Sequence, residues 1–340
     1  MVLLRKILFP FAVLYGFITW FRNYLYDNQF LKSYSFPIPV IAVGNLSVGG
    51  TGKTPQIEYL VRLLSPNHRI AVLSRGYKRK SEGFILADTN SDAQSLGDEP
   101  YQFHSKFPEI HVAVDANRKE GIEKLRTLVN PDIILLDDAY QHRKVKAGFY
   151  VLLTAYGDLY AEDFMLPTGN LREARSGANR ADVVVVTKCP QNLASEEMIK
   201  IRNKLKISKG QPLFFTFIDY DQFVYSATGR LPIEEVRRDD KLLIAGIAKP
   251  EPFFNFIKKS GDETLIFPDH HFFTDADIQK IKSAAANRKI ITTEKDFVRL
   301  KDLLPKAQLY YLPVKTSFIK NQQQFDKKIT QYVGKSTGNS

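Results

Sequence analysis

A glycine-rich segment constrains what this chain can fold into more than any other feature of the sequence. Residues 44–54 read GNLSVGGTGKT and stand between an apolar run at 39–43 and apolar residues that recur at helical spacing over 57–64. In a loop between a strand and a helix, glycines let backbone N–H groups turn toward phosphate oxygens. The strict pattern G-x-x-x-x-G-K-[ST] is not met, because Ser47 replaces its first glycine. The segment still predicts a phosphate-binding loop formed by Gly49, Gly50, Thr51, Gly52, Lys53 and Thr54.

A second segment supports this interpretation. Residues 133–138 read IILLDD, an apolar strand that ends in the carboxylates of Asp137 and Asp138. At such a strand end, one aspartate binds the magnesium ion directly or through its water shell. A second aspartate can orient or deprotonate the group next to it. Lys53 would then reach the outer phosphates, and the Thr54 hydroxyl would ligate magnesium. Acidic residues also commonly begin loops, but a preceding phosphate loop favours a metal role.

Short apolar runs alternate with helical patterns along the chain. Strands rich in Val, Ile and Leu are predicted at 39–43, 69–73, 110–114, 133–136, 149–153 and 182–186. Such strands, separated by helices, predict a mostly parallel sheet covered on both faces, an α/β fold of the P-loop NTPase type. A second alternation predicts a smaller α/β domain, with strands at 242–245, 264–267 and 290–292 and helices at 251–259 and 275–286.

The pattern divides the chain into four parts. We expect an N-terminal helix within 1–30, a phosphate-loop domain over 31–220, a smaller α/β domain over 221–330 and a disordered tail over 331–340. The stretch 219–240 is predicted to be the hinge between the two domains, which would let them close and exclude water.

Composition limits the compartment and the partners. The chain has 340 residues, of which 44% are hydrophobic, so whole-chain disorder is excluded. A single cysteine allows no internal disulfide and no thiol cluster for zinc or iron–sulfur, which favours a reducing, cytosolic location. The formal charge of +11 indicates an anionic partner: nucleic acid, a membrane surface or a phosphorylated substrate.

The N-terminal segment has the character of a membrane-surface helix. Residues 7–21 are almost all apolar and are flanked by cations, with Trp20 and several tyrosines nearby. A helix of this length covers about 22 Å, short of the ~30 Å hydrocarbon core of a bilayer. An interfacial anchor is therefore favoured over a transmembrane span. A signal peptide and a core helix of the globular domain remain alternatives.

Eight segments, taken together and in order, resemble the tetraacyldisaccharide 4'-kinases (lipid A 4'-kinases). They lie at 44–55, 74–77, 97–100 (GDEP), 137–143 (DDAYQHR), 166–173, 187–188 (TK), 269–270 (DH) and 293–296 (TEKD). The resemblance covers nearly the whole chain. One departure is Ala139, where the family usually has glycine.

The resemblance implies a P-loop kinase that works at the cytoplasmic face of the inner membrane, with ATP and Mg²⁺ as cofactors. It implies transfer of the ATP γ-phosphoryl group to the 4'-hydroxyl of a tetraacylated glucosamine disaccharide 1-phosphate, which gives lipid IVA. We expect a monomer without a nucleic-acid partner. The charge of +11 then suits a phosphorylated lipid at an anionic membrane surface.

The resemblance also implies catalytic roles. Asp98 would be the base that takes the hydroxyl proton, and His270 from the second domain would pair with it, although His271 is an alternative. Lys53 and Asp138 complete the catalytic set. The other possibilities are that Asp98 caps a helix and that His270 lies on the surface.

Metal and substrate roles follow from the same resemblance. Asp138 with Asp137 and Glu173, together with Thr54, would bind magnesium, whereas Glu173 could instead pair with Arg172 or Arg175. The predicted substrate contacts are Asn45, Arg75, Tyr77 and His142.

Two other classes of protein carry a phosphate loop. A membrane-associated ATPase switch of the deviant P-loop type often has a second lysine five residues before the first, but Val48 stands there. A nucleic-acid-binding protein would suit the positive charge, but the basic residues gather beside the phosphate-loop strands and not on an aromatic platform.

Overall fold

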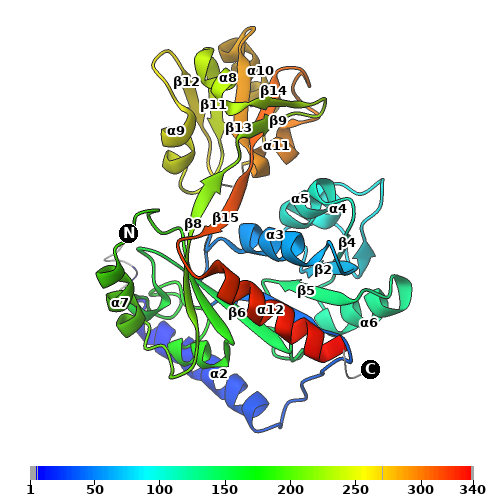
Figure 1. The fold of residues 1–340 in the computed structure, drawn as a ribbon, viewed down its shortest axis with the longest axis vertical. Coiled ribbons are helices and arrows are strands. Elements are labelled where there is room, and N and C mark those ends of the chain that lie inside the picture. The colour runs from blue at the N-terminus through cyan, green and yellow to red at the C-terminus, as the bar shows by residue number, and fades with distance from the viewer. Residues whose placement is uncertain (1–4, 6, 270, 338–340) are drawn as a thin grey trace.

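The computed structural model describes residues 5, 7–269 and 271–337, which form a large and a small lobe (Figure 1). The large lobe contains α2 (Phe9–Asp27), β1 (Val40–Asn45), α3 (Lys53–Leu64), β2 (Ile70–Ser74), β3 (Ile85–Leu86), α4 (Ala93–Leu96), α5 (Asp98–Lys106), β4 (His111–Val114), α6 (Arg118–Leu128), β5 (Ile133–Asp137), β6 (Phe149–Ala155), η1 (Tyr160–Glu162), η2 (Arg175–Arg180), β7 (Val183–Thr187), α7 (Ser195–Lys204), β8 (Leu213–Tyr220), β15 (Val314–Phe318) and α12 (Gln322–Thr337). The small lobe contains β9 (Phe223–Tyr225), β10 (Arg230–Pro232), α8 (Ile233–Arg238), β11 (Lys241–Ala245), α9 (Glu251–Ile257), β12 (Glu263–Ile266), α10 (Asp275–Ala285), β13 (Lys289–Thr293), α11 (Glu294–Leu300) and β14 (Leu309–Leu312).

The large lobe is built on a nine-stranded sheet in the order β15-β8-β7-β6-β1-β5-β2-β4-β3. The strands from β8 to β4 in this order are parallel to their neighbours, and only the two edge strands β15 and β3 run antiparallel. Strand β1, which leads into the glycine-rich loop, pairs with β5 on one side and β6 on the other. The predicted mostly parallel α/β fold is confirmed.

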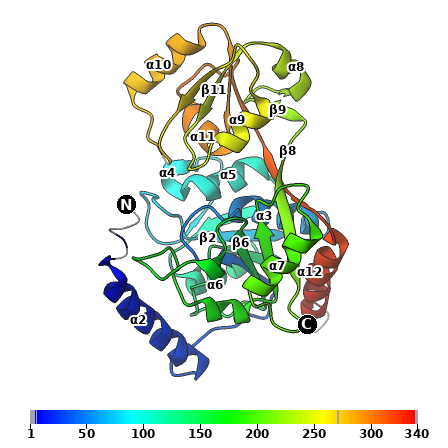
Figure 2. The ribbon, with the colours of Figure 1, turned by 90° about the vertical axis from the view of Figure 1, so that its left-hand side faces the viewer.

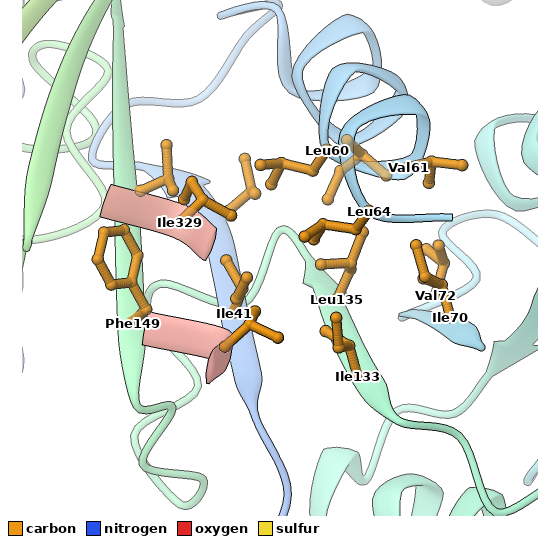
Figure 3. Packing of buried hydrophobic residues seen from close by; sticks show 14 of the residues in the cluster. Ile41, Leu60, Val61, Leu64, Ile70, Val72, Ile133, Leu135, Phe149 and Ile329 are labelled. Atoms are coloured by element: carbon orange, nitrogen blue, oxygen red, sulfur yellow. The ribbon is translucent and has the colours of Figure 1, made fainter. Parts of the chain in front are cut away.

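Helices cover both faces of this sheet because successive strand residues point to opposite sides. In β1, Ile41 and Val43 pack in one core with α3 and α12, whereas Val40 and Ala42 pack in another core with α6. Figure 3 shows the first of these cores, where Leu60 and Leu64 of α3 lie over the sheet. All six residues of β1 are buried, which anchors the loop that follows.

The small lobe has its own six-stranded sheet in the order β10-β9-β14-β13-β11-β12. Two antiparallel strands, β8 and β15, lead to it and back from it, with Tyr220 opposite Val314 (Figure 1). The predicted hinge at 219–240 is therefore wrong, because most of that stretch forms β9, β10 and α8. The connection between the lobes is a two-stranded ribbon, whose second strand lies far along the chain.

The C-terminal segment returns to the large lobe. Helix α12 continues through Thr337, so the predicted disordered tail is wrong for residues 331–337, while 338–340 lie outside the described residues. Phe325, Ile329 and Val333 recur every four residues and are almost fully buried against the large sheet. The predicted end of the small domain at 330 is also wrong, because β15 and α12 both belong to the large lobe.

Helix α2 lies along the outside of the large lobe (Figure 2). Only Ala12 of this helix is buried, so it is not a core helix as one alternative held. Its exposed apolar side chains, each 48–62% accessible, are Phe9, Phe11, Val13, Leu14, Phe17, Ile18, Trp20 and Phe21. Among the described residues, no helix has the combination of length and apolarity that crossing a membrane requires.

Candidate active site

The glycine-rich loop lies at the carboxyl end of β1 and begins helix α3. Gly52 has a φ of 82°, a left-handed conformation that glycine adopts without steric cost, and it caps α3 directly before Lys53 and Thr54. Thr51 is held from two sides: its hydroxyl accepts a hydrogen bond of 2.8 Å from Asn45 Nδ2, and its carbonyl accepts one of 2.8 Å from Thr187 Oγ1. The loop therefore presents a helix N-terminus, where free backbone N–H groups favour an anion.

The paired aspartates lie beside this loop, because β5 is the neighbour of β1. Asp137 ends β5, and Asp138 follows with a φ of 48°. The Lys53 ammonium lies 3.7 Å from the Asp138 carboxylate. Although burial opposes the shift, the charges of Lys53 and Arg172 hold the pKa of Asp138 below its usual value. The loop lysine and the Asp138 carboxylate thus form an ion pair at the ends of two neighbouring strands.

Asp137 has a different environment from Asp138. It is buried, and its Oδ2 accepts a hydrogen bond of 3.1 Å from the Ser74 hydroxyl. Burial and the neighbouring Asp138 charge raise the pKa of Asp137 to about 6. Its buried Oδ1 has no hydrogen-bond partner among the described residues. A buried carboxylate oxygen without a partner is a ligand of the kind that a hard cation such as Mg²⁺ prefers.

Glu173, predicted as a third magnesium ligand, is buried and engaged by protein groups. Its carboxylate accepts hydrogen bonds from Arg180 (2.8 Å), Gln141 Nε2 (2.8 Å) and Asn23 Nδ2 of α2 (3.2 Å). Its ion-pair partner is thus Arg180, and neither Arg172 nor Arg175. No group of three or more acidic, His or Cys side chains in the described part of the chain is arranged to hold a metal. A metal role for Glu173 stays a prediction.

Arg172 joins the loop to the paired aspartates, and sequence reasoning missed this role. Its guanidinium donates to both oxygens of Asp138 (2.7 and 3.1 Å) and also to the side chain of Asn45. Asn45 is fully buried, and its side chain is occupied by Thr51 and Arg172. In this structure Asn45 therefore braces the loop, and its predicted substrate contact stays untested. The only contact that the sequence suggested for Arg172 was an ion pair with Glu173, which the structure does not form.

Asp98 begins α5, directly after Gly97, which has a φ of 91°. A Cβ at residue 97 would lie 3.0 Å from the carbonyl oxygen of Tyr77, so the loop after β2 packs closely on this turn. The Asp98 carboxylate forms an ion pair with Arg299 of α11 in the small lobe. Its predicted partner His270 lies outside the described residues.

The alternative partner, His271, is engaged elsewhere. Its Nε2 lies 3.0 Å from the Asp277 carboxylate of α10. The same carboxylate caps α10 by accepting hydrogen bonds from the backbone N–H and the hydroxyl of Thr274. His271 therefore belongs to the start of α10 in this structure, and Asp98 meets the small lobe through α11.

The remaining predicted substrate residues lie near the strand ends. Arg75 and Tyr77 follow β2 and are exposed, Tyr77 by 63%. Burial, followed by the charges of Arg118 and Arg22, lowers the pKa of His142 to about 4. The buried Nε2 of His142 has no hydrogen-bond partner among the described residues. These groups give the site a neutral imidazole beside cations, a setting that suits an anionic ligand.

A largely buried ion cluster joins the two lobes. Lys106, at the end of α5, lies 2.7 Å from Glu58 of α3 and also pairs with Glu294, the first residue of α11. Burial and the Glu58 charge raise the pKa of Glu294 to about 7. Lys106 therefore links α3 and α5 to the small lobe. Helix α3 begins at the phosphate loop, and helix α5 begins at Asp98.

Comparisons with known proteins show which family this chain resembles over its length. The family model described as tetraacyldisaccharide-1-P 4'-kinase matches residues 4–334. The tetraacyldisaccharide 4'-kinase of Flavobacterium johnsoniae is 66% identical to this chain, and the match covers 98% of each protein. The tetraacyldisaccharide 4'-kinase of Bacteroides thetaiotaomicron is 44% identical, and the match covers 99% of this chain and 95% of the relative. A crystal structure of Aquifex aeolicus LpxK in complex with ATP is 30% identical with a TM-score of 0.80, covering 97% of this chain and 99% of that one. The chain belongs to the tetraacyldisaccharide 4'-kinase family.

Proposed function

We propose that this chain transfers the γ-phosphoryl group of ATP to the 4'-hydroxyl of a tetraacylated glucosamine disaccharide 1-phosphate, giving lipid IVA in lipid A biosynthesis. The observation that carries the proposal is the meeting of the phosphate loop and the paired aspartates, with Lys53 3.7 Å from Asp138. Membership of a kinase family favours this reaction over the alternative of an ATPase switch.

Nucleotide binding falls to the loop residues. Backbone N–H groups of Gly49, Gly50, Thr51 and Gly52 would bind the phosphates at the N-terminus of α3, and Lys53 would contact the outer phosphates. When ATP arrives, the Lys53 ammonium has to turn from Asp138 toward the γ-phosphate. Arg172 stays paired with Asp138 and keeps that carboxylate in place meanwhile.

Asp137, Asp138 and Thr54 would hold Mg²⁺, and Glu173 is proposed as a further ligand through water. Bound Mg²⁺ neutralises charge on the phosphoryl oxygens. The unpartnered Oδ1 of Asp137 supports this assignment. Asn45 supports the site indirectly, because its amide holds Thr51 in the loop.

The acceptor end needs a base. A sugar hydroxyl is a weak nucleophile, so a carboxylate within reach of its proton raises the rate. We assign this role to Asp98, with His270 as its proposed partner. The hydroxyl oxygen forms the new bond to phosphorus, the bond from phosphorus to the β–γ bridging oxygen breaks, and the hydroxyl proton passes to Asp98. Arg299, paired with Asp98, would orient the carboxylate during this step.

The 1-phosphate and the sugar would meet Arg75, Tyr77 and His142 near the end of β2 and after β5. Helix α2 would lie in the cytoplasmic surface of the inner membrane, with its exposed apolar side chains in the lipid. The helix is tied to the site, because the Tyr15 hydroxyl donates to the carbonyl of Arg172 (3.0 Å) and Asn23 donates to Glu173. The substrate could thus stay in the membrane while its headgroup is phosphorylated.

The reaction itself gives the first test. Purified protein in detergent is incubated with ATP labelled at the γ-phosphate, Mg²⁺ and the lipid A disaccharide 1-phosphate. We expect label on the lipid in amounts equal to the ADP formed, and none on the lipid when the substrate already carries a 4'-phosphate. ATP consumption without labelled lipid would contradict the proposed function.

The membrane role of α2 gives a second prediction. The double variant Phe11→Ser/Phe17→Ser removes two side chains that are 62% and 60% exposed. Each ring contributes about 1 kcal/mol or more when it enters the interface, so we expect roughly 10- to 30-fold weaker binding in sedimentation with vesicles of phosphatidylethanolamine and phosphatidylglycerol.

A matched control uses exposed apolar residues elsewhere on the large lobe. Leu128→Ser/Ile199→Ser removes side chains that are 61% and 60% exposed on α6 and α7. This variant should bind vesicles like the wild type. Equal losses in both double variants would show that α2 has no special part in membrane binding.

A further inference from the structure

The residue pair Thr187-Lys188 stands out because the phosphate loop contacts it although it comes from another strand. Thr187 ends β7, which is separated from β1 by β6 in the sheet. Its buried hydroxyl donates a hydrogen bond of 2.8 Å to the carbonyl of Thr51. The end of β7 thus supports the loop from the side, and the next residue is a lysine.

Lys188 leaves the strand in a conformation that returns its side chain to the loop. Its φ is 57°, in the left-handed region that a lysine rarely adopts. Its ammonium nitrogen lies 3.7 Å from the point where a Cβ on Gly50 would stand. Strained backbone of this kind is kept where the surrounding structure determines it, and such positions are common at functional sites.

Among the residues that the structure describes, no carboxylate lies within ion-pair distance of the Lys188 ammonium. Within the described part of the chain it makes neither a hydrogen bond nor an ion pair, whereas Lys53 has Asp138 at 3.7 Å. Lys188 as a whole residue is exposed, but desolvation of its ammonium lowers its pKa. The positive charges of Lys249 and Lys53 lower this pKa further, whereas the negative charge of Asp158 opposes the shift. A lysine beside a phosphate loop, among other lysines, is arranged for an anion that comes from outside the chain.

We propose that Lys188 is a second phosphate-binding lysine, which contacts the polyphosphate of the bound nucleotide over Gly50. This inference rests on the proposed function, because it assumes that ATP occupies the phosphate loop. Some P-loop proteins carry a second lysine five residues before the first, a position that Val48 occupies here. Lys188 would supply the second positive charge that this position lacks. Here the second charge comes from the end of β7 instead of from within the loop.

The test compares nucleotide binding in Lys188→Ala, Lys188→Arg and the wild type, using titration with the non-hydrolysable analogue AMPPNP, ADP and adenosine. A charge-assisted contact to phosphate predicts about tenfold weaker binding of AMPPNP and ADP by Lys188→Ala, with adenosine unaffected. Lys188→Arg should restore most of the affinity. The dependence of AMPPNP affinity on salt should also become shallower in Lys188→Ala, a change that a merely structural role would not produce.

Lys200→Ala is the matched control, because Lys200 is an exposed lysine on α7 paired with Glu197. It should bind all three ligands like the wild type. If the wild type binds AMPPNP and Lys188→Ala binds it within twofold, the inference is overturned while the proposed function stands. If the wild type itself does not bind AMPPNP, the proposed function fails and this inference with it. Should Lys188→Ala not fold, Lys188→Gln serves in the same comparison, since it keeps the side-chain length and removes the charge.

Discussion

Asp98→Asn is expected to lower the rate of lipid phosphorylation by about 10²- to 10⁴-fold, the contribution typical of a positioned general base. The amide has nearly the shape of the carboxylate, and its oxygen can still accept a hydrogen bond from Arg299, so the contact between α5 and α11 should persist. The amide cannot take the proton of the sugar hydroxyl. We therefore expect the loss in kcat, measured with labelled ATP and saturating lipid substrate, and unchanged affinity for AMPPNP.

Asp92→Asn is the matched control for this variant. Asp92 directly precedes α4, the helix before α5, and its side chain caps α4 by accepting a hydrogen bond of 2.7 Å from the Ser95 backbone. Asparagine caps a helix as well as aspartate does, so full activity is expected. A kcat for Asp98→Asn within tenfold of the wild type would remove Asp98 from the base role and leave its ion pair with Arg299 as its function.

Phe325→Ala is expected to lower the free energy of unfolding by about 3–5 kcal/mol, which is the usual range for removing a buried phenylalanine from a core. Phe325 is 0% exposed and packs its ring against those of Tyr59, Phe214 and Phe318. The ring thus joins α12 to α3 and to both strands of the ribbon between the lobes. Urea unfolding followed by circular dichroism measures the change.

Gln323→Ala tests whether the effect comes from the buried ring or from the helix. Gln323 is exposed on the same turn of α12, and alanine favours a helix slightly more than glutamine does. Its free energy of unfolding should stay within about 0.5 kcal/mol of the wild type. A loss below about 1 kcal/mol for Phe325→Ala would mean that α12 does not form part of the core.

The phosphate loop and the paired aspartates were predictable because their signals are local. An apolar run followed by glycines and then Lys53 and Thr54 specifies strand, loop and helix in that order. The apolar run ending in Asp137 is equally local. Because parallel strands end at the same edge of a sheet, the carboxylates and the loop could be expected to meet, and Lys53 and Asp138 do.

The C-terminal helix and the ribbon were not predicted, for a physical reason. Helix α12 has only a narrow apolar stripe, Phe325, Ile329 and Val333, in a polar segment that reads as a tail. Its stability comes from burial against α3, β6 and β8, which lie far away in the sequence. The helical spacing of these three residues was the signal available in the sequence. Three apolar residues do not predict a stable helix unless the surface that buries them is known.

The sequence alone determined the fold class, the phosphate loop, the strand with paired carboxylates and the resemblance to a kinase family, since these depend on residue order over short stretches. Only the tertiary structure decided that Arg172 links Asn45 to Asp138, that Arg180 holds Glu173, and that Lys188 reaches Gly50 from β7. The contacts of Arg172 and Lys188 join residues from separate elements of the fold, whereas the contact of Arg180 depends on the turn of η2. The distances between these residues depend on sheet order and backbone conformation, and local sequence patterns predict neither.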